Sequence, residues 1–576
     1  MNNAAACPRQ PRASRAPVIR ILRGAVVVAS VASLVACTSG EVVPPEPVPA
    51  TSAAAVDAST FTFGSAADPR TLDPALANDT ESYRVTRQIL QGLVGIDPLT
   101  SEPTELLAES WEEQDSGRSY EFTLRDDVVF HDGRPLDAAA VCANFDRWYT
   151  LPASARTGAG RLPFEHVFKG YSDQPEISLY KGCTATTPST VDLQLTSRIT
   201  GLIAALAAPA FAISSPAALD AGSADDLTEP VDGSLISRYG RAPVGTGPFR
   251  FVSWEPGEVD LVSFEDYWGE RGEVDRVLFT TISNPDSRAR ALTAGRIDGY
   301  DFVSVDSAVD LARNGQQFLQ RDPYSVLYLG LNQGFPGVDD VLFRQAVAHA
   351  IDKDALIDGR FLSGTKSARQ FVPEKLGVSG EGVEDYGYDV DLAKDLLDRS
   401  GYDGRPLPFY YPRNVSRAYL PSPEKAYAEL SRQLTEAGFT IKPVPIDWSE
   451  GYIEAVQQTG DRAFHLLGWS GSYEDPDNFV GALFGSYTEE FGYEDPQLFS
   501  KINRARGLPE GEDRSEAYAD ISAQISTRIP AVPLAFPISA LAMSPRVSSY
   551  PVSPVMNEVF NRIDLADVEP RPEPSE

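Results

Sequence analysis

The sequence predicts a mixed α/β protein with two or more lobes, and three observations lead to that class. At 576 residues the chain is long enough for about two to four domains. Hydrophobic residues make up 42% of it and aromatic residues 10%, which is enough for packed cores. Strand-like and helix-like patterns alternate along the body, and we find no internal repeat.

The first part of the body alternates short strands with helices. Residues 61–65 predict a strand, and residues 84–94 place apolar side chains at helical spacing. Alternating polar and apolar residues predict a half-buried strand at 120–124. Asp137 can accept hydrogen bonds from the free N–H groups at the start of a helix, so we expect it to cap a helix that runs to Trp148.

The alternation continues through the rest of the body. Within 341–361, Arg344 and Asp352 lie two helical turns apart, and the simplest interpretation is a solvated or interlobe ion pair. The patterns predict strands at 191–195, 250–255, 260–264 and 328–332, and helices at 202–208, 287–294, 341–361 and 393–401.

The charged and metal-ligating residues argue against several classes of partner. Asp and Glu outnumber Lys and Arg by 82 to 50, a net charge of -32, and so acidic a surface repels nucleic acid. The four cysteines and four histidines show no ligand spacing, so we expect no metal site and no cofactor. His131, which precedes Asp132-Gly133, is interpreted as a residue that hydrogen-bonds within a turn.

The N-terminus predicts the compartment. Residues 24–36 are uncharged and follow a stretch with five arginines and no acidic residue. This run is too short to cross a hydrocarbon core about 30 Å thick but fits a secretory signal, so residues 1–36 are predicted to be a signal peptide. Leu34-Val35-Ala36 before Cys37 resembles a bacterial lipobox, which predicts that Cys37 carries lipid.

The remaining cysteines fit a location outside the cytoplasm. Cys7 belongs to the predicted signal peptide and Cys37 to the lipid site, which leaves Cys142 and Cys183. We expect these two to form a disulfide in an oxidising compartment, and two buried free thiols are the alternative. Residues 37–59 are rich in Pro, Ala and Ser and predict a flexible tether.

Ten groups of short motifs carry a resemblance to a known family. They are Thr71–Pro74, Leu107–Trp111, Phe122–Arg125 with Phe130–Gly133, Gly245–Phe249, Tyr267–Trp268, Ala291–Asp298, Phe343–Ala346, Ala350–Lys353, Ala393–Leu397 with Gly401–Tyr402, and Asp475–Phe479. In this order they resemble the peptide/nickel family of extracytoplasmic solute-binding proteins, the capture subunits of ABC importers. The resemblance covers residues 61–563. The family includes oligopeptide- and dipeptide-binding lipoproteins.

The resemblance implies a two-lobed, periplasmic-binding-protein-like fold of type II, in the large class with an extra domain and a hinge between the lobes. The chain is expected to cross between lobes near Pro323–Gly334 and Ile529–Ser539. The implied domains are a signal peptide at 1–36, the lipidated Cys37 and its tether at 37–59, lobe I at 60–95, 240–325 and 536–565, the extra domain at 96–239, lobe II at 326–535, and a disordered tail at 566–576.

The ligand is expected where the lobes meet, because ligand sites favour domain interfaces. Trp448 and Trp469 offer flat apolar surfaces that accept varied side chains, and core packing is the alternative for each. The residues after Trp469 would meet the polar end of the ligand. The complete predicted ligand-binding set is Trp448, Trp469, Ser470, Gly471, Ser472, Tyr473, Asn332 and Phe536.

At one position the sequence departs from the family. Peptide-binding members typically carry an Asp three residues after this Trp, where it pairs with the N-terminal ammonium of the peptide, whereas this chain has Ser472. Glu474 or Asp475 could replace that carboxylate, although Asp475 precedes Pro476 and more simply fixes a turn. Peptide remains the leading ligand class, and a blocked peptide, an oligosaccharide or a metal chelate is the alternative.

A secreted hydrolase is the alternative from another class. Gly468–Ser472 approaches a GxSxG nucleophile elbow but ends in Ser, and no motif supplies a histidine base, so we expect no catalytic residue. The expected partners are a small solute and an ABC permease of the cytoplasmic membrane. The chain is expected to be a monomer held to the outer face of the bacterial cell membrane by its lipid alone.

Overall fold

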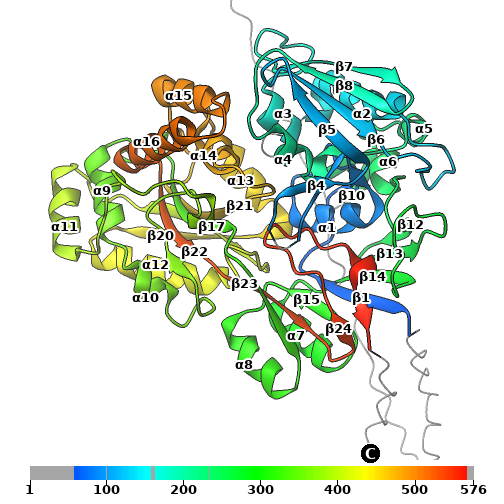
Figure 1. The fold of residues 1–576 in the computed structure, drawn as a ribbon. Coiled ribbons are helices and arrows are strands. Elements are labelled where there is room, and N and C mark those ends of the chain that lie inside the picture. The colour runs from blue at the N-terminus through cyan, green and yellow to red at the C-terminus, as the bar shows by residue number, and fades with distance from the viewer. Residues whose placement is uncertain (1–57, 99, 157–161, 232–233, 459, 567–576) are drawn as a thin grey trace, which may run out of the picture. The chain divides into compact units, whose positions relative to one another are not determined.

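The computed structural model describes residues 58–98, 100–156, 162–231, 234–458 and 460–566. The predicted signal peptide, Cys37 and nearly all of the predicted tether and tail lie outside these residues. Three sheets, each with its own hydrophobic core, organise the described body (Figure 1), and we name the regions built on them by their number of strands. Within the described ranges, no helix is long and apolar enough to cross a membrane.

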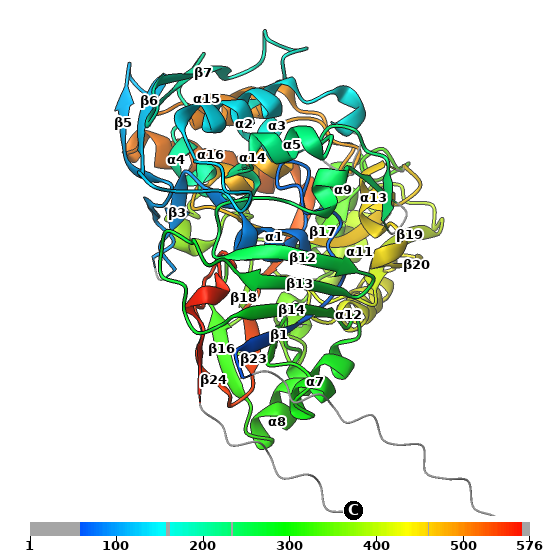
Figure 2. The same cartoon turned by 90° about the vertical axis from the view of Figure 1, so that its right-hand side faces the viewer.

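The seven-strand region holds a mixed sheet in the order β12-β13-β14-β1-β15-β23-β16 (Figure 2). Strand β1 lies parallel to β14 and β15, and the other pairs are antiparallel. Val85 and Ile89 anchor helix α1 in its core. Its elements are β1 (Thr60–Ser65), α1 (Thr80–Ile89), β12 (Phe249–Glu255), β13 (Glu258–Ser263), β14 (Arg276–Thr281), α7 (Pro285–Thr293), β15 (Gly299–Asp301), α8 (Val305–Arg313), β16 (Gln317–Arg321) and β23 (Ser539–Met543).

The six-strand region holds a sheet in the order β18-β22-β17-β21-β19-β20, with β17 between β21 and β22. Every residue of β17 is buried, as expected for a central strand. The elements are β17 (Ser325–Leu331), α9 (Val341–His349), α10 (Lys353–Ile357), β18 (Lys366–Ser367), α11 (Val390–Arg399), β19 (Leu407–Arg413), α12 (Pro423–Glu436), β20 (Ile441–Asp447), α13 (Tyr452–Gln458), β21 (Phe464–Ser470), α14 (Asp477–Phe484), α15 (Pro496–Arg506), α16 (Glu512–Arg528) and β22 (Ala531–Phe536).

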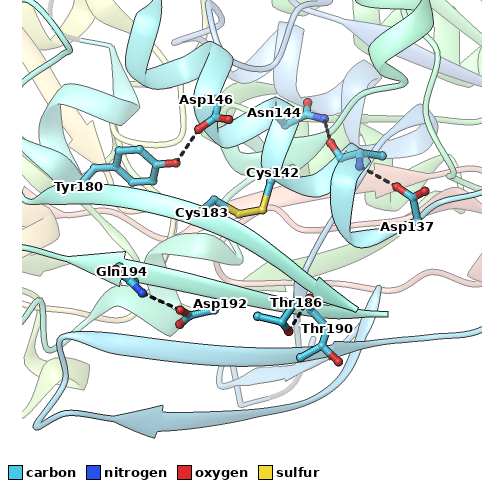
Figure 3. Close-up of a disulfide and its surroundings, with 11 residues drawn as sticks. Asp137, Cys142, Asn144, Asp146, Tyr180, Cys183, Thr186, Thr190, Asp192 and Gln194 are labelled. Atoms are coloured by element: carbon cyan, nitrogen blue, oxygen red, sulfur yellow. Dashed lines mark hydrogen bonds between the residues drawn. A yellow bond between two sulfur atoms is a disulfide. The ribbon is translucent and has the colours of Figure 1, made fainter. Parts of the chain in front are cut away.

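The four-strand region holds an antiparallel sheet in the order β5-β6-β8-β7, and helix α2 packs against β7. The predicted disulfide between Cys142 and Cys183 is present and joins α2 to β7, with a Cα–Cα distance of 5.2 Å (Figure 3). Cys183 lies within strand β7. The elements are β5 (Ala108–Gln114), β6 (Ser119–Leu124), α2 (Ala138–Thr150), α3 (Pro163–Phe168), β7 (Tyr180–Thr187), β8 (Thr190–Leu195) and α4 (Leu202–Leu206).

Short elements complete the described body. The two-stranded pairs are β2 (Gln91–Gly92) with β9 (Ala212–Ile213), β3 (Val94–Ile96) with β4 (Pro103–Glu105), β10 (Glu229–Val231) with β11 (Ser234–Ile236), and β24 (Val547–Ser549) with β25 (Asp564–Leu565). The remaining helices are α5 (Pro216–Ala221) and α6 (Arg238–Arg241). The 3₁₀ turns are η1 (Ala153–Arg156), η2 (Pro209–Phe211), η3 (Glu374–Leu376), η4 (Trp448–Glu450) and η5 (Phe560–Arg562).

Two short connections join the two large sheets. Residues 322–324 lead from β16 into β17, and residues 537–538 lead from β22 into β23. The first connection begins one residue before the expected crossing at Pro323–Gly334, and the second lies within Ile529–Ser539. The strands of each large sheet come from the segments that the sequence assigned to one lobe, except that Ser325 of β17 and Phe536 of β22 fall in segments assigned to lobe I. The lobe boundaries themselves stay predictions.

Local hydrogen bonds explain where two predicted helices differ from the structure. The expected 84–94 helix is α1, which begins earlier because Asp79 accepts from the N–H of Ser82 and ends before the extended Leu90. The expected 341–361 helix is split into α9 and α10, because Asp352 caps α10. The predicted Arg344–Asp352 ion pair is absent, since Arg344 donates instead to the main-chain carbonyls of Val338, Asp339 and Arg528.

Candidate ligand-binding site

A cavity of about 490 Å³ lies where segments of all three regions come together. Its volume is within the range of about 300–1,000 Å³ that is typical of small-molecule sites. The seven-strand region contributes residues along α1, and the four-strand region contributes residues of α3 and η2. The six-strand region contributes η4, the end of β21 and the start of α14.

Six of the eight predicted ligand-binding residues line this cavity: Trp448, Trp469, Ser470, Gly471, Ser472 and Tyr473. The half-buried indole of Trp469 donates to the carbonyl oxygen of Asn478 at 2.6 Å, which fixes the ring in the wall. A Cβ at Gly471 would lie 2.5 Å from the ring of Tyr324, so this close packing requires glycine.

The other two predicted residues do not line the cavity. The side-chain amide of Asn332 donates to the carbonyl oxygens of Gly460 and Arg462 and accepts from the N–H of Gly334, so its polar atoms already have main-chain partners. Phe536 is 5% exposed and belongs to the core of the six-strand region, where its backbone pairs with Lys366. Both residues lie in the segments where the chain is expected to cross between lobes. That position along the chain does not determine which groups their side chains contact.

Four arginines line the cavity, and three of them pair with carboxylates. Arg70 pairs with Glu454, and Arg506 pairs with Asp477. Arg417 pairs with Glu81 at 3.1 Å, and its guanidinium lies 4.1 Å from the centre of the Trp448 ring. Such a cation over an indole face is an attractive contact, so Arg417 and Trp448 hold each other in the wall.

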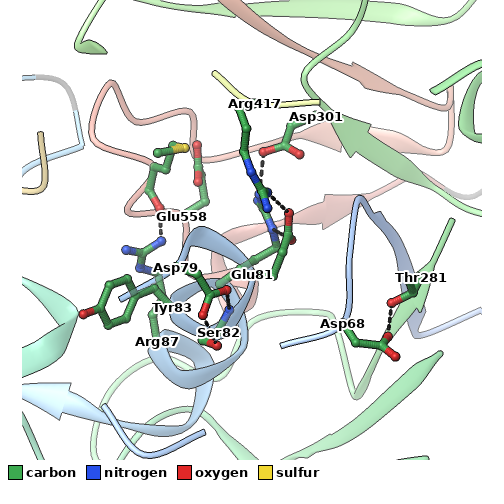
Figure 4. Close-up of polar contacts among 12 residues, drawn as sticks. Asp68, Asp79, Glu81, Ser82, Tyr83, Arg87, Thr281, Asp301, Arg417 and Glu558 are labelled. Carbon is green, nitrogen blue, oxygen red and sulfur yellow. Dashed lines mark hydrogen bonds and ion pairs between the residues drawn. The ribbon is translucent and has the colours of Figure 1, made fainter. Parts of the chain in front are cut away.

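Arg87 differs from these three arginines. Its guanidinium donates to the carbonyl oxygen of Met556 and takes part in no ion pair among the described residues (Figure 4). Burial lowers the pKa of Arg87 to about 10, although Glu558 opposes this shift. Arg87 therefore stays charged at neutral pH and presents a positive group to the cavity without a carboxylate partner.

Three carboxylates line the cavity: Asp79, Asp477 and Glu490. Asp79 is the N-cap of α1 and accepts from both the N–H and the hydroxyl of Ser82. Asp477 pairs with Arg506, as described above. Glu490 accepts from the hydroxyl of Tyr328 at 2.7 Å and from His465 at 3.1 Å.

Glu474 and Asp475, the two possible replacements for the absent family Asp, lie outside the cavity lining. Glu474 pairs with Lys375 at 2.5 Å. Asp475 pairs with Arg514 at 2.7 Å and accepts from the N–H of Asp477, so the turn-fixing interpretation is correct. Burial raises the pKa of Asp475 to about 6 even though Arg514 opposes the shift.

Sequence reasoning missed most of the charged lining. Arg70 precedes the Thr71–Pro74 motif by one residue, and this adjacency is the only signal that could have indicated it. No sequence motif indicates that Arg87, Arg417 and Glu490 line a cavity, because only the fold brings these three distant segments together.

A model of a known protein family matches this chain. It describes bacterial extracellular solute-binding proteins of family 5 and matches residues 102–491, more than half of the chain. The chain belongs to this family. It is therefore a solute-binding protein whose function is ligand capture, and its fold is that of a type II periplasmic binding protein.

Individual solute-binding proteins resemble it over most of its length. Heme-binding protein A of Haemophilus influenzae is 27% identical and covers 88% of this chain and 92% of its own. The dipeptide-binding protein of Escherichia coli is 26% identical, with 89% and 96% covered. The dipeptide-binding protein of Pseudoalteromonas sp. SM9913, solved with Met-Leu, has a TM-score of 0.78 at 22% identity, covering 88% of this chain and 100% of that one.

The histidines of this solute-binding protein differ in their surroundings: His166 lines the cavity, while His131, His349 and His465 each hydrogen-bond to another residue. Within the described ranges, neither Ser470 nor Ser472 makes a side-chain hydrogen bond to a histidine. His131 bonds to the carbonyl oxygen of Gly247 at 2.9 Å, a residue 116 positions away, and so not within its own turn as expected. No group of three or more potential metal-ligating side chains occurs in the described part of the chain.

Proposed function

We propose that this chain captures short peptides outside the cytoplasm and delivers them to an ABC permease. The observation that carries the proposal is Arg87, a half-buried cation that faces the cavity without a carboxylate partner among the described residues. A peptide carboxylate supplies that partner, and a charge-assisted hydrogen bond of this kind contributes about 1.5–3 kcal/mol.

The walls of the cavity support a peptide as well. Trp448 and Trp469 present apolar ring surfaces, while Ser470 and Ser472 add hydroxyl groups beside them. Flat aromatic surfaces bury varied side chains at a low cost in conformational entropy, which suits a ligand class of changing sequence. The relatives that bear dipeptide-binding names, one of them solved with Met-Leu, support the same class.

A metal chelate such as haem is the second candidate. The half-buried side chains of His166 and Met556 line the same cavity, and imidazole and thioether groups are haem ligands. The relative named heme-binding protein A points the same way. Arg87 would then face a haem carboxylate, so this cation alone does not separate the two candidates.

Two measurements test the proposal, and the first decides between the two candidates. Mass spectrometry of the ligand released from gently purified, denatured protein should identify short peptides. Arg87→Gln should lower the affinity for a peptide with a free carboxylate about tenfold or more and leave an amidated peptide unaffected, as measured by calorimetry. Release of haem, or binding of haem alone with the matching absorption band, would refute the peptide proposal.

Capture would proceed by closure of the two large regions over the ligand. Residues 322–324 and 537–538 form the paired connections about which such a hinge turns. Lys425 of α12 pairs with Asp306 of α8, and Arg70 pairs with Glu454, so ion pairs already cross between the two regions. Variants that remove these pairs should bind ligand more weakly while both regions stay folded.

Delivery to a permease would be aided by a lipid anchor at Cys37, which lies outside the described residues. A Cys37→Ala protein should lose its acyl modification and either stay unprocessed or appear in the medium. Metabolic labelling with a radioactive fatty acid, followed by cell fractionation, measures both results. A variant that remains membrane-bound with the mobility of the wild type would refute the anchor.

A further inference from the structure

We propose that Glu490 binds the positively charged group of the captured ligand and replaces the carboxylate that Ser472 does not supply. The inference rests on the proposed function and names a chemical requirement of that site. The ligand should carry an ammonium group, from either the N-terminus of a peptide or a lysine side chain.

One oxygen of Glu490 is available to a ligand. The residue lines the cavity although it is only 7% exposed. Both of its side-chain hydrogen bonds, from the Tyr328 hydroxyl at 2.7 Å and from His465 Nε2 at 3.1 Å, go to Oε1. Among the described residues Oε2 accepts no hydrogen bond, so a buried carboxylate oxygen beside the cavity retains its full acceptor capacity.

The two partners of Glu490 are uncharged. Burial raises the pKa of Tyr328 well above its ordinary value, so the phenol stays protonated. Burial also lowers the pKa of His465, which keeps the imidazole neutral at physiological pH. Arg462 Nε donates to His465 Nδ1 at 3.5 Å, which places the imidazole proton on Nε2, facing Glu490.

Arg462 interacts electrostatically with Glu490, but its guanidinium hydrogen-bonds to other acceptors. It donates to the main-chain carbonyls of Glu489 at 2.8 Å and Glu490 at 2.6 Å, and it forms no ion pair with the Glu490 carboxylate in the described part of the chain. The Glu490 carboxyl group thus has two neutral hydrogen-bond donors and no direct Arg or Lys partner among the described residues.

The other two cavity carboxylates are already occupied. Asp477 pairs with Arg506 and accepts from the hydroxyl of Tyr518, and Asp79 serves as the N-cap of α1. Both oxygens of Asp79 accept from Ser82, whereas Glu490 has one oxygen that accepts no hydrogen bond among the described residues. Like Asp79, Glu490 pairs with no Arg or Lys side chain in that part of the chain. A ligand ammonium would supply both the missing charge and the missing donor.

The test uses the mature protein and a pool of di- to pentapeptides in free-amine and N-acetylated forms, half of each form containing lysine. Retained peptides are identified by mass spectrometry after denaturation, and their affinities are measured by calorimetry. Glu490→Gln keeps the shape and the Oε1 acceptor but removes the charge. Glu489→Gln removes the same charge from an exposed neighbour outside the cavity lining and serves as the matched control.

The wild type and Glu489→Gln should prefer peptides that carry an ammonium group at least tenfold, and Glu490→Gln should lose this preference. Acetylated peptides with and without lysine show whether the group is the N-terminus or a side chain. If Glu490→Gln is poorly folded by circular dichroism, Glu490→Asp should keep the preference at reduced affinity. Retention of peptides with no preference, or with one that survives Glu490→Gln, overturns this inference alone. Retention of no peptide overturns it together with the peptide function.

Discussion

Two clusters of buried side chains in this protein hold their carboxylates in different ways. In the seven-strand region, Asp301 accepts from Arg84 at 2.6 Å and from Arg321 at 3.2 Å, and Glu558 accepts from Arg321 at 2.7 Å. In the six-strand region, Glu490 is held by the neutral side chains of Tyr328 and His465.

This difference distinguishes a carboxylate that stabilises the fold from one that can bind a ligand. A buried carboxylate paired with guanidinium groups is already neutralised, so it has little to offer a ligand and costs much to disturb. A buried carboxylate held by neutral donors and facing a cavity keeps its charge available. Arg417 lies between the two cases, because it pairs with Glu81, which also contacts Arg84, and yet lines the cavity.

The largest expected effect comes from breaking the paired cluster. Asp301→Ala leaves Arg84 and Arg321 buried without their shared carboxylate, so we expect the protein to lose about 3–5 kcal/mol of stability. Glu490→Gln keeps an acceptor for both of its partners and should lose less than about 1 kcal/mol. Urea titration followed by tryptophan fluorescence measures both, and equal losses would show that the two clusters do not differ as described.

The second largest expected effect is on ligand affinity and not on the stability of the fold. Trp469→Ala removes an indole from the cavity wall and should weaken peptide binding by about 2 kcal/mol, or about thirtyfold. Trp111→Ala, a partly buried tryptophan of β5 outside the cavity lining, is the control and should leave binding unchanged. Calorimetry gives the affinities, and a thermal melt should show that the Trp469 variant remains folded.

The sequence predicted what contiguous patterns encode. Trp469 to Tyr473 form one run of residues, so the motif located this part of the wall, and Cys142 and Cys183 were the pair left outside the signal and lipid sites. Arg87 and Glu490 could not be predicted, because a single charged residue in a segment gives no sign of which cavity the fold will bring it to. Asn332 does not line the cavity, and its position along the chain gave no sign that its side-chain amide donates to main-chain carbonyls.

The prediction with the smallest expected effect tests the role of Glu490 most directly, because it places a carboxylate at a second position in the same cavity. Ser472 lines the cavity from the loop after β21, so Ser472→Asp returns the carboxylate that peptide-binding relatives are expected to carry there. We expect this variant to strengthen binding of free-amine peptides and weaken that of N-acetylated ones, changing their ratio about tenfold, or about 1.4 kcal/mol.

The double variant Ser472→Asp with Glu490→Gln provides the control. If both carboxylates serve the same ammonium, Ser472→Asp should restore the preference that Glu490→Gln removes, because one cavity carboxylate then stands in for the other. Matched calorimetric titrations with Met-Leu and N-acetyl-Met-Leu measure the ratio in all four proteins. An unchanged ratio in the single Ser472→Asp variant would mean that Ser472 does not lie at the amine end of the ligand. A changed ratio there without rescue in the double variant would mean that Glu490 binds a different group.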